Sequence, residues 1–112
     1  HLTLPTEPLV RAIRRVALLS SERSRAVKLE LSDGQLVITS SNPDLGDARE
    51  ELDIDYAGEP LAIGFNAKYL LDAINAVQSK EVLFSFQDEL SPTRLSPPGD
   101  EKTIAVVMPM RI

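Results

Sequence analysis

Two segments of the chain place apolar residues at the spacing of an amphipathic helix. One covers residues 6–19 and the other residues 67–78, and in each the apolar positions recur three and four residues apart. The positions are Leu9, Ala12, Ile13 and Val16 in the first segment, and Leu70, Ala73, Ile74 and Val77 in the second. Thr6 and Asn66 are residue types that cap helix N-termini, so we expect each of them to begin its helix.

Most other apolar residues alternate with polar ones over short runs, as in strands with one buried face. These runs cover residues 26–31, 35–40, 50–56, 61–65, 81–86, 92–95 and 103–107. Ser32-Asp33-Gly34 predicts a hairpin turn between the first two runs. Residues 41–47 are expected to form a loop, because Asn42-Pro43 and Gly46 interrupt the alternation.

The two helical segments belong to an internal repeat. PLVRAIRRV at residues 8–16 and YLLDAINAV at residues 69–77 share Leu, Ala, Ile and Val at an offset of 61 residues. Several short strands follow each helix, but only the second helix has a clear strand before it. We therefore expect a duplicated strand–helix–three-strand unit whose first strand is truncated and lies upstream of this chain. Two helices on one face of an antiparallel sheet would make an α+β fold.

Charge is distributed unevenly around a net value of −5. Residues 11–28 hold six basic residues and one acidic residue, whereas residues 29–112 hold six basic and 15 acidic ones. Arg11, Arg14 and Arg15 fall on the polar side of the first helix. That side is either an ordinary solvated face or a cationic binding surface, although the overall acidic balance argues against nucleic acid.

The carboxyl-terminal run Val106-Val107-Met108-Pro109-Met110-Arg111-Ile112 is unusually apolar for a chain end. Pro109 cannot donate to a β-ladder, so the last strand should leave its sheet near there. Methionine is common on surfaces that accept several partners. The run is either a final strand packed on the core or one wall of a groove for apolar peptides.

The sequence carries little that could support catalysis. It has no cysteine, so neither a disulfide nor a thiolate metal site is expected. Glu51, Asp53 and Asp55 alternate along one strand, but no histidine beyond His1, no glycine-rich phosphate loop and no nucleophile motif accompanies them. We expect no catalytic residue, metal or cofactor. No apolar run has the length of a membrane span, and the chain, which starts at His1, is expected to be part of a longer protein.

Four motifs, which together run over almost the whole chain, resemble one known family. They are ALLSSERSRAVKLELSDGQLVIT at residues 17–39, SSNPDLGDAREELDIDYAG at 40–58, IGFNAKYLLDAINA at 63–76 and VVMPMRI at 106–112. In these motifs the chain resembles the third, C-terminal domain of the bacterial DNA polymerase III beta subunit, the sliding clamp. The terminal MPMR together with GFN-x-x-Y is the most specific part of this resemblance.

The resemblance implies a ring of two subunits joined head to tail around duplex DNA, with three such domains in each subunit and helices lining the hole. Such a ring is not an enzyme. It tethers the catalytic subunit of DNA polymerase III, and it also binds the clamp loader and other proteins that carry a clamp-binding peptide. The expected location is the bacterial cytoplasm, at the nucleoid. The alternative is a free-standing protein-interaction domain without a role on DNA.

The resemblance also implies three sets of site residues. A peptide groove would comprise Asn66, Tyr69, Leu90, Pro92, Val106, Val107, Met108, Pro109, Met110, Arg111 and Ile112. A DNA-facing set would comprise Arg11, Arg14 and Arg15. A subunit interface would comprise Leu18, Leu19, Asp44, Asp47 and Glu50.

Overall fold

The computed structural model of the chain describes residues 2–18, 26–42, 46–86, 88, 90–99 and 104–110, except for the side chains of residues 41 and 42. Ten elements follow one another along it. They are β1 (Leu2–Pro5), α1 (Thr6–Ala17), β2 (Ala26–Ser32), β3 (Gln35–Asn42), β4 (Gly46–Asp53), β5 (Leu61–Asn66), α2 (Ala67–Val77), β6 (Glu81–Ser85), β7 (Thr93–Ser96) and β8 (Ala105–Val107). The order confirms the predicted strand–helix–three-strand repeat.

The first strand of the first unit lies within the chain, which corrects our expectation that it would lie upstream. Leu2 and Leu4 of β1 point into the core, while Thr3 and Pro5 are exposed. A strand of four residues carries too short an alternation to be recognised from the sequence alone. Its pairing with β6, where Leu4 lies opposite Val82, makes it a strand.

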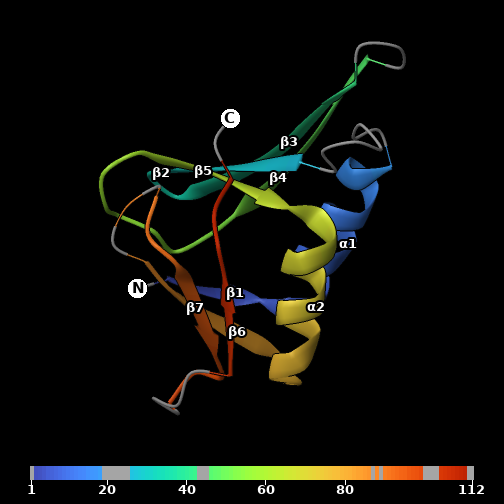
Figure 1. Cartoon of the computed structure of the whole chain (residues 1–112). Coiled ribbons are helices and arrows are strands. Elements are labelled where there is room, and N and C mark those ends of the chain that lie inside the picture. Colours follow the sequence, from blue (N-terminus) through green and yellow to red (C-terminus); the bar gives the residue numbers. More distant parts are fainter. Residues whose placement is uncertain are drawn as a thin grey trace.

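The strands form two antiparallel sheets rather than the single sheet we expected. One sheet has the order β4-β3-β2-β5 and the other the order β1-β6-β7-β8 (Figure 1). Each unit therefore gives its first strand to the sheet that the other unit builds. The α+β class is confirmed, and the two sheets share one hydrophobic core with the helices.

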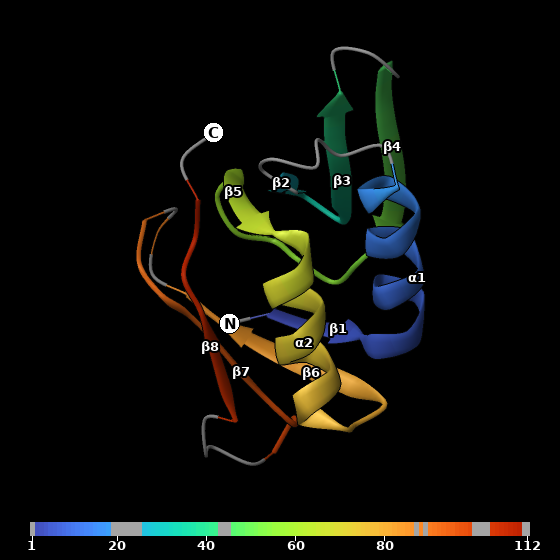
Figure 2. The same ribbon diagram turned by 45° about the vertical axis from the view of Figure 1, so that its right-hand side comes forward.

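Helices α1 and α2 lie side by side along one side of the molecule (Figure 2). Their apolar positions at helical spacing are all buried, as predicted from the sequence. Asn66 caps α2 as expected, because its side-chain oxygen accepts hydrogen bonds from the backbone N–H groups of Lys68 and Tyr69. Thr6 does not cap α1. Pro5 occupies the cap position, and the Thr6 N–H instead donates to the carbonyl oxygen of Lys80 at 2.9 Å.

The hairpin of β3 and β4 is longer than the alternation indicates. The pairing runs from Gln35 opposite Asp53 to Asn42 opposite Gly46, so residues 41, 42, 46 and 47 of the predicted loop belong to strands, and residues 43–45 lie outside the described residues. Polar residues are tolerated here because β4 is the edge strand of its sheet. In the part of the chain that the structure describes, neither helix is long and apolar enough to cross a membrane.

Candidate functional site

The β7–β8 ladder sorts the apolar residues near the carboxyl terminus into two faces. Val107 pairs with Thr93, and both side chains are buried. Val106 pairs with Arg94 on the opposite, solvent-facing side, where the Val106 side chain is 56% exposed. Val107 therefore belongs to the core, which corrects its assignment to the surface of the groove. Alternation along a strand is the reason, since neighbouring side chains point to opposite faces.

Three apolar side chains form an exposed row on that solvent-facing side, which we call the apolar ledge. It consists of Ile104, Val106 and Met108. Met108 is 61% exposed, more than is usual for a large apolar side chain in a domain with a well-filled core. Pro92 precedes the last pair of the ladder and is also exposed. The ledge is therefore solvent-accessible apolar surface in this chain.

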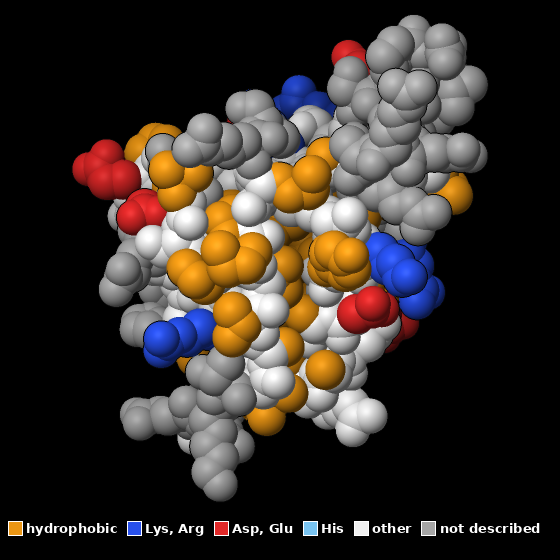
Figure 3. Space-filling view, in the orientation of Figure 1, with side chains coloured by type: hydrophobic (Ala, Val, Ile, Leu, Met, Phe, Trp, Pro, Cys, Tyr) orange, Lys and Arg blue, Asp and Glu red, His pale blue; other side chains and the backbone are white. Residues whose placement is uncertain are grey.

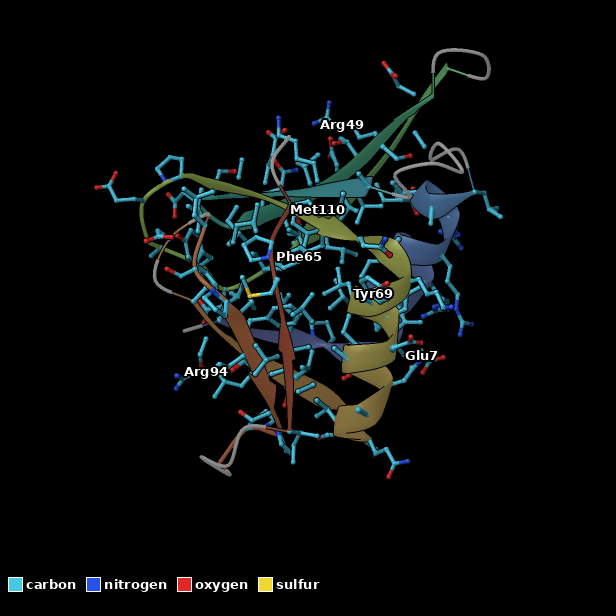
Figure 4. The ribbon with its side chains drawn as sticks, in the orientation of Figure 1. Glu7, Arg49, Phe65, Tyr69, Arg94 and Met110 are labelled. Atoms are coloured by element: carbon cyan, nitrogen blue, oxygen red, sulfur yellow. The ribbon has the colours of Figure 1, made fainter. Side chains whose placement is uncertain are left out.

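Beyond β8 the chain crosses from one sheet to the other. The Met110 N–H donates to the carbonyl oxygen of Gly64 at 2.7 Å, which places Met110 beside β5 at an isolated antiparallel bridge. Gly64 lies two residues before Asn66, so this contact brings the half-buried Pro109 and Met110 to the start of α2. Figure 4 shows Met110 next to Phe65, with Tyr69 on the adjoining turn of α2.

The cap at Asn66 orients the first turn of α2 toward this region. Its contacts with the backbone of Lys68 and Tyr69, at 3.0 and 3.3 Å, hold the turn that presents Tyr69. The Tyr69 ring is 64% exposed. Hydrophobic side chains gather over β8 and the beginning of α2 on this face of the molecule, with polar and backbone atoms between them (Figure 3). Tyr69 and Met110 thus border one area, and Asn66 holds the turn that carries Tyr69.

A turn held by Asp88 presents Leu90 at the entrance to β7. One carboxylate oxygen of Asp88 accepts the backbone N–H groups of Leu90 and Ser91, each at 2.8 Å. The hydrogen bond from the Leu90 N–H, with those from Ser91, lowers the pKa of Asp88 because it stabilises the charged form. Leu90 is 58% exposed, so it adds apolar surface upstream of Pro92. Sequence reasoning did not single out Asp88. A signal was present, because an Asp side chain in a turn commonly accepts a hydrogen bond from the backbone two residues further on.

The arginines of α1 separate into two groups. Arg11 and Arg14 line a hollow of about 770 Å³ between α1 and the end of α2. The other lining residues are Thr6, Glu7, Pro8, Val10, Asn75, Gln78, Ser79 and Lys80. Lys80 therefore joins the two arginines, while Glu7 offsets part of their charge. Arg15 lies outside the hollow, because its Nη1 atom is 3.0 Å from Oε1 of Glu50 on β4.

The residues expected at a subunit interface lie at the end of α1 and on β4. Leu18, the C-cap residue of α1, is 81% exposed, which is the largest exposure among the large apolar side chains that the structure describes. Asp47 is exposed, whereas Glu50 is only half-exposed and already pairs with Arg15 within the chain. Leu19, Asp44, Arg111 and Ile112 lie outside the described residues.

The carboxylates weighed for catalysis are held by neighbouring side chains or lie in solvent. Glu51 pairs with Arg49 at 2.6 Å and accepts a hydrogen bond from Gln35 at 3.1 Å. Asp53 and Asp55 are exposed. Among the described residues, no group of three or more His, Cys, Asp or Glu side chains could hold a metal ion.

Comparisons with known proteins identify the chain's relatives. Residues 1–111 match the family described as DNA polymerase III beta subunit, C-terminal domain. The beta sliding clamp of Caulobacter vibrioides is 42% identical over 111 residues, and that of Escherichia coli K12 is 38% identical over 112 residues. These alignments cover 99% and 100% of this chain but only 30% and 31% of those proteins. The chain thus spans about a third of the length of these relatives.

Solved structures give the same picture. The DNA polymerase sliding clamp of Pseudomonas aeruginosa superimposes with a TM-score of 0.94 at 36% sequence identity, over 99% of this chain and 31% of that one. A DnaN sliding clamp from the same organism, bound to griselimycin, superimposes with a TM-score of 0.93, also at 36% identity, over 99% of this chain and 30% of that one.

Proposed function

The chain belongs to the family of the DNA polymerase III beta subunit, C-terminal domain, and from that premise we propose that it is the third domain of a bacterial sliding clamp. In this proposal the whole protein is a processivity factor. It is a ring that encircles duplex DNA without sequence preference and holds DNA polymerase III to its template. The domain supplies docking surface and ring structure, and it carries no catalytic site of its own.

The observation that carries the proposal is the apolar area that the carboxyl-terminal residues build with the start of α2. The exposed Val106, Met108 and Tyr69 offer side chains that an apolar peptide can cover. Methionine adapts its shape to different neighbours, which suits a surface that accepts several competing clients. The proposed clients are the polymerase catalytic subunit, the clamp loader and other proteins with a clamp-binding peptide. Such a peptide typically carries a glutamine followed by hydrophobic and aromatic residues.

Two further surfaces complete the proposed ring. Arg11 and Arg14, together with Lys80, would face the DNA backbone, because phosphates attract cations without fixing a register along the duplex. Leu18 and Asp47 would face the neighbouring subunit in a head-to-tail homodimer. An apolar side chain as exposed as Leu18 is readily explained by burial against a partner. A ring of this kind would work in the cytoplasm at the nucleoid.

The test uses the full-length protein, a peptide of the type Gln-x-x-Leu-Phe and two matched variants. Met108→Ala should weaken peptide binding about tenfold, because it removes an exposed anchor of the surface, and it should leave dimer assembly unchanged. Leu18→Ala should weaken dimer assembly and leave the peptide affinity unchanged. Fluorescence anisotropy gives the affinity, and analytical ultracentrifugation gives the assembly state. Equal peptide affinities for the wild type and Met108→Ala would contradict the proposed groove.

A further inference from the structure

Arg94 stands beside Val106 of the apolar ledge, at the edge of the proposed groove, although sequence reasoning did not include it. It lies directly opposite Val106 in the β7–β8 register, and both side chains are exposed. Pro92 occupies the position two residues before Arg94, so both project from the same side of the chain. Figure 4 shows the Arg94 side chain extending away from β7 toward solvent, on the side of the sheet opposite α2.

The guanidinium of Arg94 has no ion-pair partner among the residues that the structure describes. The other arginine on a strand, Arg49, pairs with Glu51 at 2.6 Å, and Lys28 on β2 pairs with Glu30 at 3.1 Å. The strand cations of the other sheet are thus neutralised by a neighbour on their own strand. On β7 the corresponding neighbours are Pro92 and Ser96, which carry no charge. Arg94 keeps its charge available beside apolar surface.

We propose that Arg94 is a specificity-determining residue of the groove, which favours docking segments that carry an acidic side chain next to their apolar anchors. This inference rests on the proposed function, since it concerns which peptides the same surface prefers. An arginine binds a carboxylate through two parallel N–H···O bonds, so it selects a planar acid better than an isolated amide. When the peptide covers Val106 and Met108, it would also exclude water from one side of the ion pair between Arg94 and the acidic side chain.

The position of Arg94 distinguishes a peptide carboxylate from a DNA phosphate. Arg94 and the buried Leu95 alternate along β7, and Leu95 faces the core with α2. Arg94 therefore points away from the helices, whereas Arg11 and Arg14 lie in the hollow between them. A phosphate backbone that passes the helices would not reach the opposite face of the β1-β6-β7-β8 sheet. Within the described residues Arg94 is the cation beside the ledge, and its attraction for an acidic client would oppose the repulsion from the chain's net charge of −5.

The experiment measures peptide affinities for the full-length protein. All peptides carry the Gln-x-x-Leu-Phe anchors. At each position that flanks these anchors, one peptide carries a glutamate and a matched peptide carries a glutamine. The peptides end in an amide, and one set with a free terminal carboxylate shows whether that group substitutes for the side chain. Wild type, Arg94→Gln and Arg94→Lys are compared with Arg49→Gln, which removes the same charge from β4 of the other sheet. Anisotropy at low and high salt gives each dissociation constant.

We expect the wild type to prefer glutamate over glutamine about two- to fivefold at one flanking position, with a smaller preference at high salt. The preference should vanish in Arg94→Gln, persist in part in Arg94→Lys and be unchanged in Arg49→Gln. A preference that survives in Arg94→Gln, or binding without any preference in the wild type, overturns the role of Arg94 and leaves the groove intact. If no peptide binds the wild type at all, the proposed function itself is contradicted.

Discussion

Arg15 and Glu50 form an ion pair that joins α1 to β4, with Nη1 of Arg15 at 3.0 Å from Oε1 of Glu50. The resemblance to the clamp family assigns these residues to different surfaces, Arg15 to one facing DNA and Glu50 to one facing a neighbouring subunit. In the folded chain, the two side chains are ion-pair partners of each other. The contact fastens the last turn of α1, which is followed by the C-cap residue Leu18, to the edge strand that carries Asp47.

This pair should contribute little to stability, because the Arg15 side chain is 69% exposed and solvent screens the interaction. A double-mutant cycle of Arg15→Gln and Glu50→Gln is expected to give a coupling free energy of about 0.2–0.5 kcal/mol, smaller at high salt. Urea denaturation of the four proteins measures it. A coupling several times larger, or one indifferent to salt, would mean that the pair is much less solvated than its exposure indicates.

The Met110 N–H to Gly64 bond predicts a stability cost when the donor is removed. Met110→Pro deletes that N–H and should lower the free energy of unfolding by at least about 0.5–1.5 kcal/mol, the usual net value of one such hydrogen bond. Met110→Leu keeps the donor and a similar side-chain volume, so it should cost much less. Thermal and chemical denaturation of the two variants decides the point, and equal costs would show that the side chain rather than the backbone holds this crossing.

Asp88 predicts a local pH dependence at Leu90. Hydrogen bonds from Leu90 and Ser91 lower the pKa of Asp88 in the folded protein. The stabilisation is therefore fully present above the ordinary carboxyl pKa of about 4, and it is lost as the pH falls through the lower folded value. The amide resonances of Leu90 and Ser91 should stay constant from neutral pH to the ordinary pKa and shift below it.

A substitution checks that the carboxylate of Asp88 causes this behaviour. In Asp88→Asn the side-chain carbonyl can still accept the two N–H groups, but it cannot be protonated, so the low-pH shift at Leu90 and Ser91 should disappear. In Asp88→Ala the turn loses its acceptor at every pH, and peptide affinity should fall because Leu90 is no longer held. Unchanged affinity in Asp88→Ala would show that Leu90 takes no part in docking.

The separation of the α1 arginines predicts which cations act on DNA. Replacement of Arg11 and Arg14 by glutamine should weaken retention of the ring on duplex DNA and reduce the slope of log affinity against log salt by up to about 2, since each phosphate contact adds about 0.9. Arg15→Gln should change the slope much less, because Glu50 already pairs with Arg15. The double variant Lys28→Gln, Arg49→Gln removes the same charge from the β4-β3-β2-β5 sheet and should leave retention unchanged. An equal loss in both double variants would indicate a net-charge effect.

Local structure could be predicted from the sequence where residues close together in the chain determine it. Asn66 was correctly predicted as a cap because a polar side chain followed by an apolar helical pattern satisfies the free N–H groups nearby. The same reasoning failed at Thr6, because the helix already includes Thr6 and Pro5 holds the cap position, after a strand whose end is fixed by the bond from the Thr6 N–H to the distant carbonyl oxygen of Lys80. Contacts of that kind leave no trace in a local pattern.

Placement across long distances could not be predicted from periodicity. The repeat predicted two equivalent units, but nothing in its pattern shows that β1 pairs with β6 while β5 pairs with β2. Arg94 was missed for a similar reason, since its importance depends on Val106, which lies opposite it only after the ladder has formed. The apolar carboxyl terminus could be recognised as unusual from the sequence. The bridge from Met110 to Gly64 could not be predicted, because it joins residues that meet only in the folded chain.

The exchange of β1 and β5 between the two sheets interlocks the halves of the chain. If the backbone were cut between Asp53 and Leu61, each half would keep three strands of one sheet and a single strand that belongs to the other sheet. Neither piece could then close its own core, so an ancestral half-length protein would have needed a second copy to supply the missing edge. Joining two such copies in one polypeptide turns an association that depends on concentration into a single cooperative folding event.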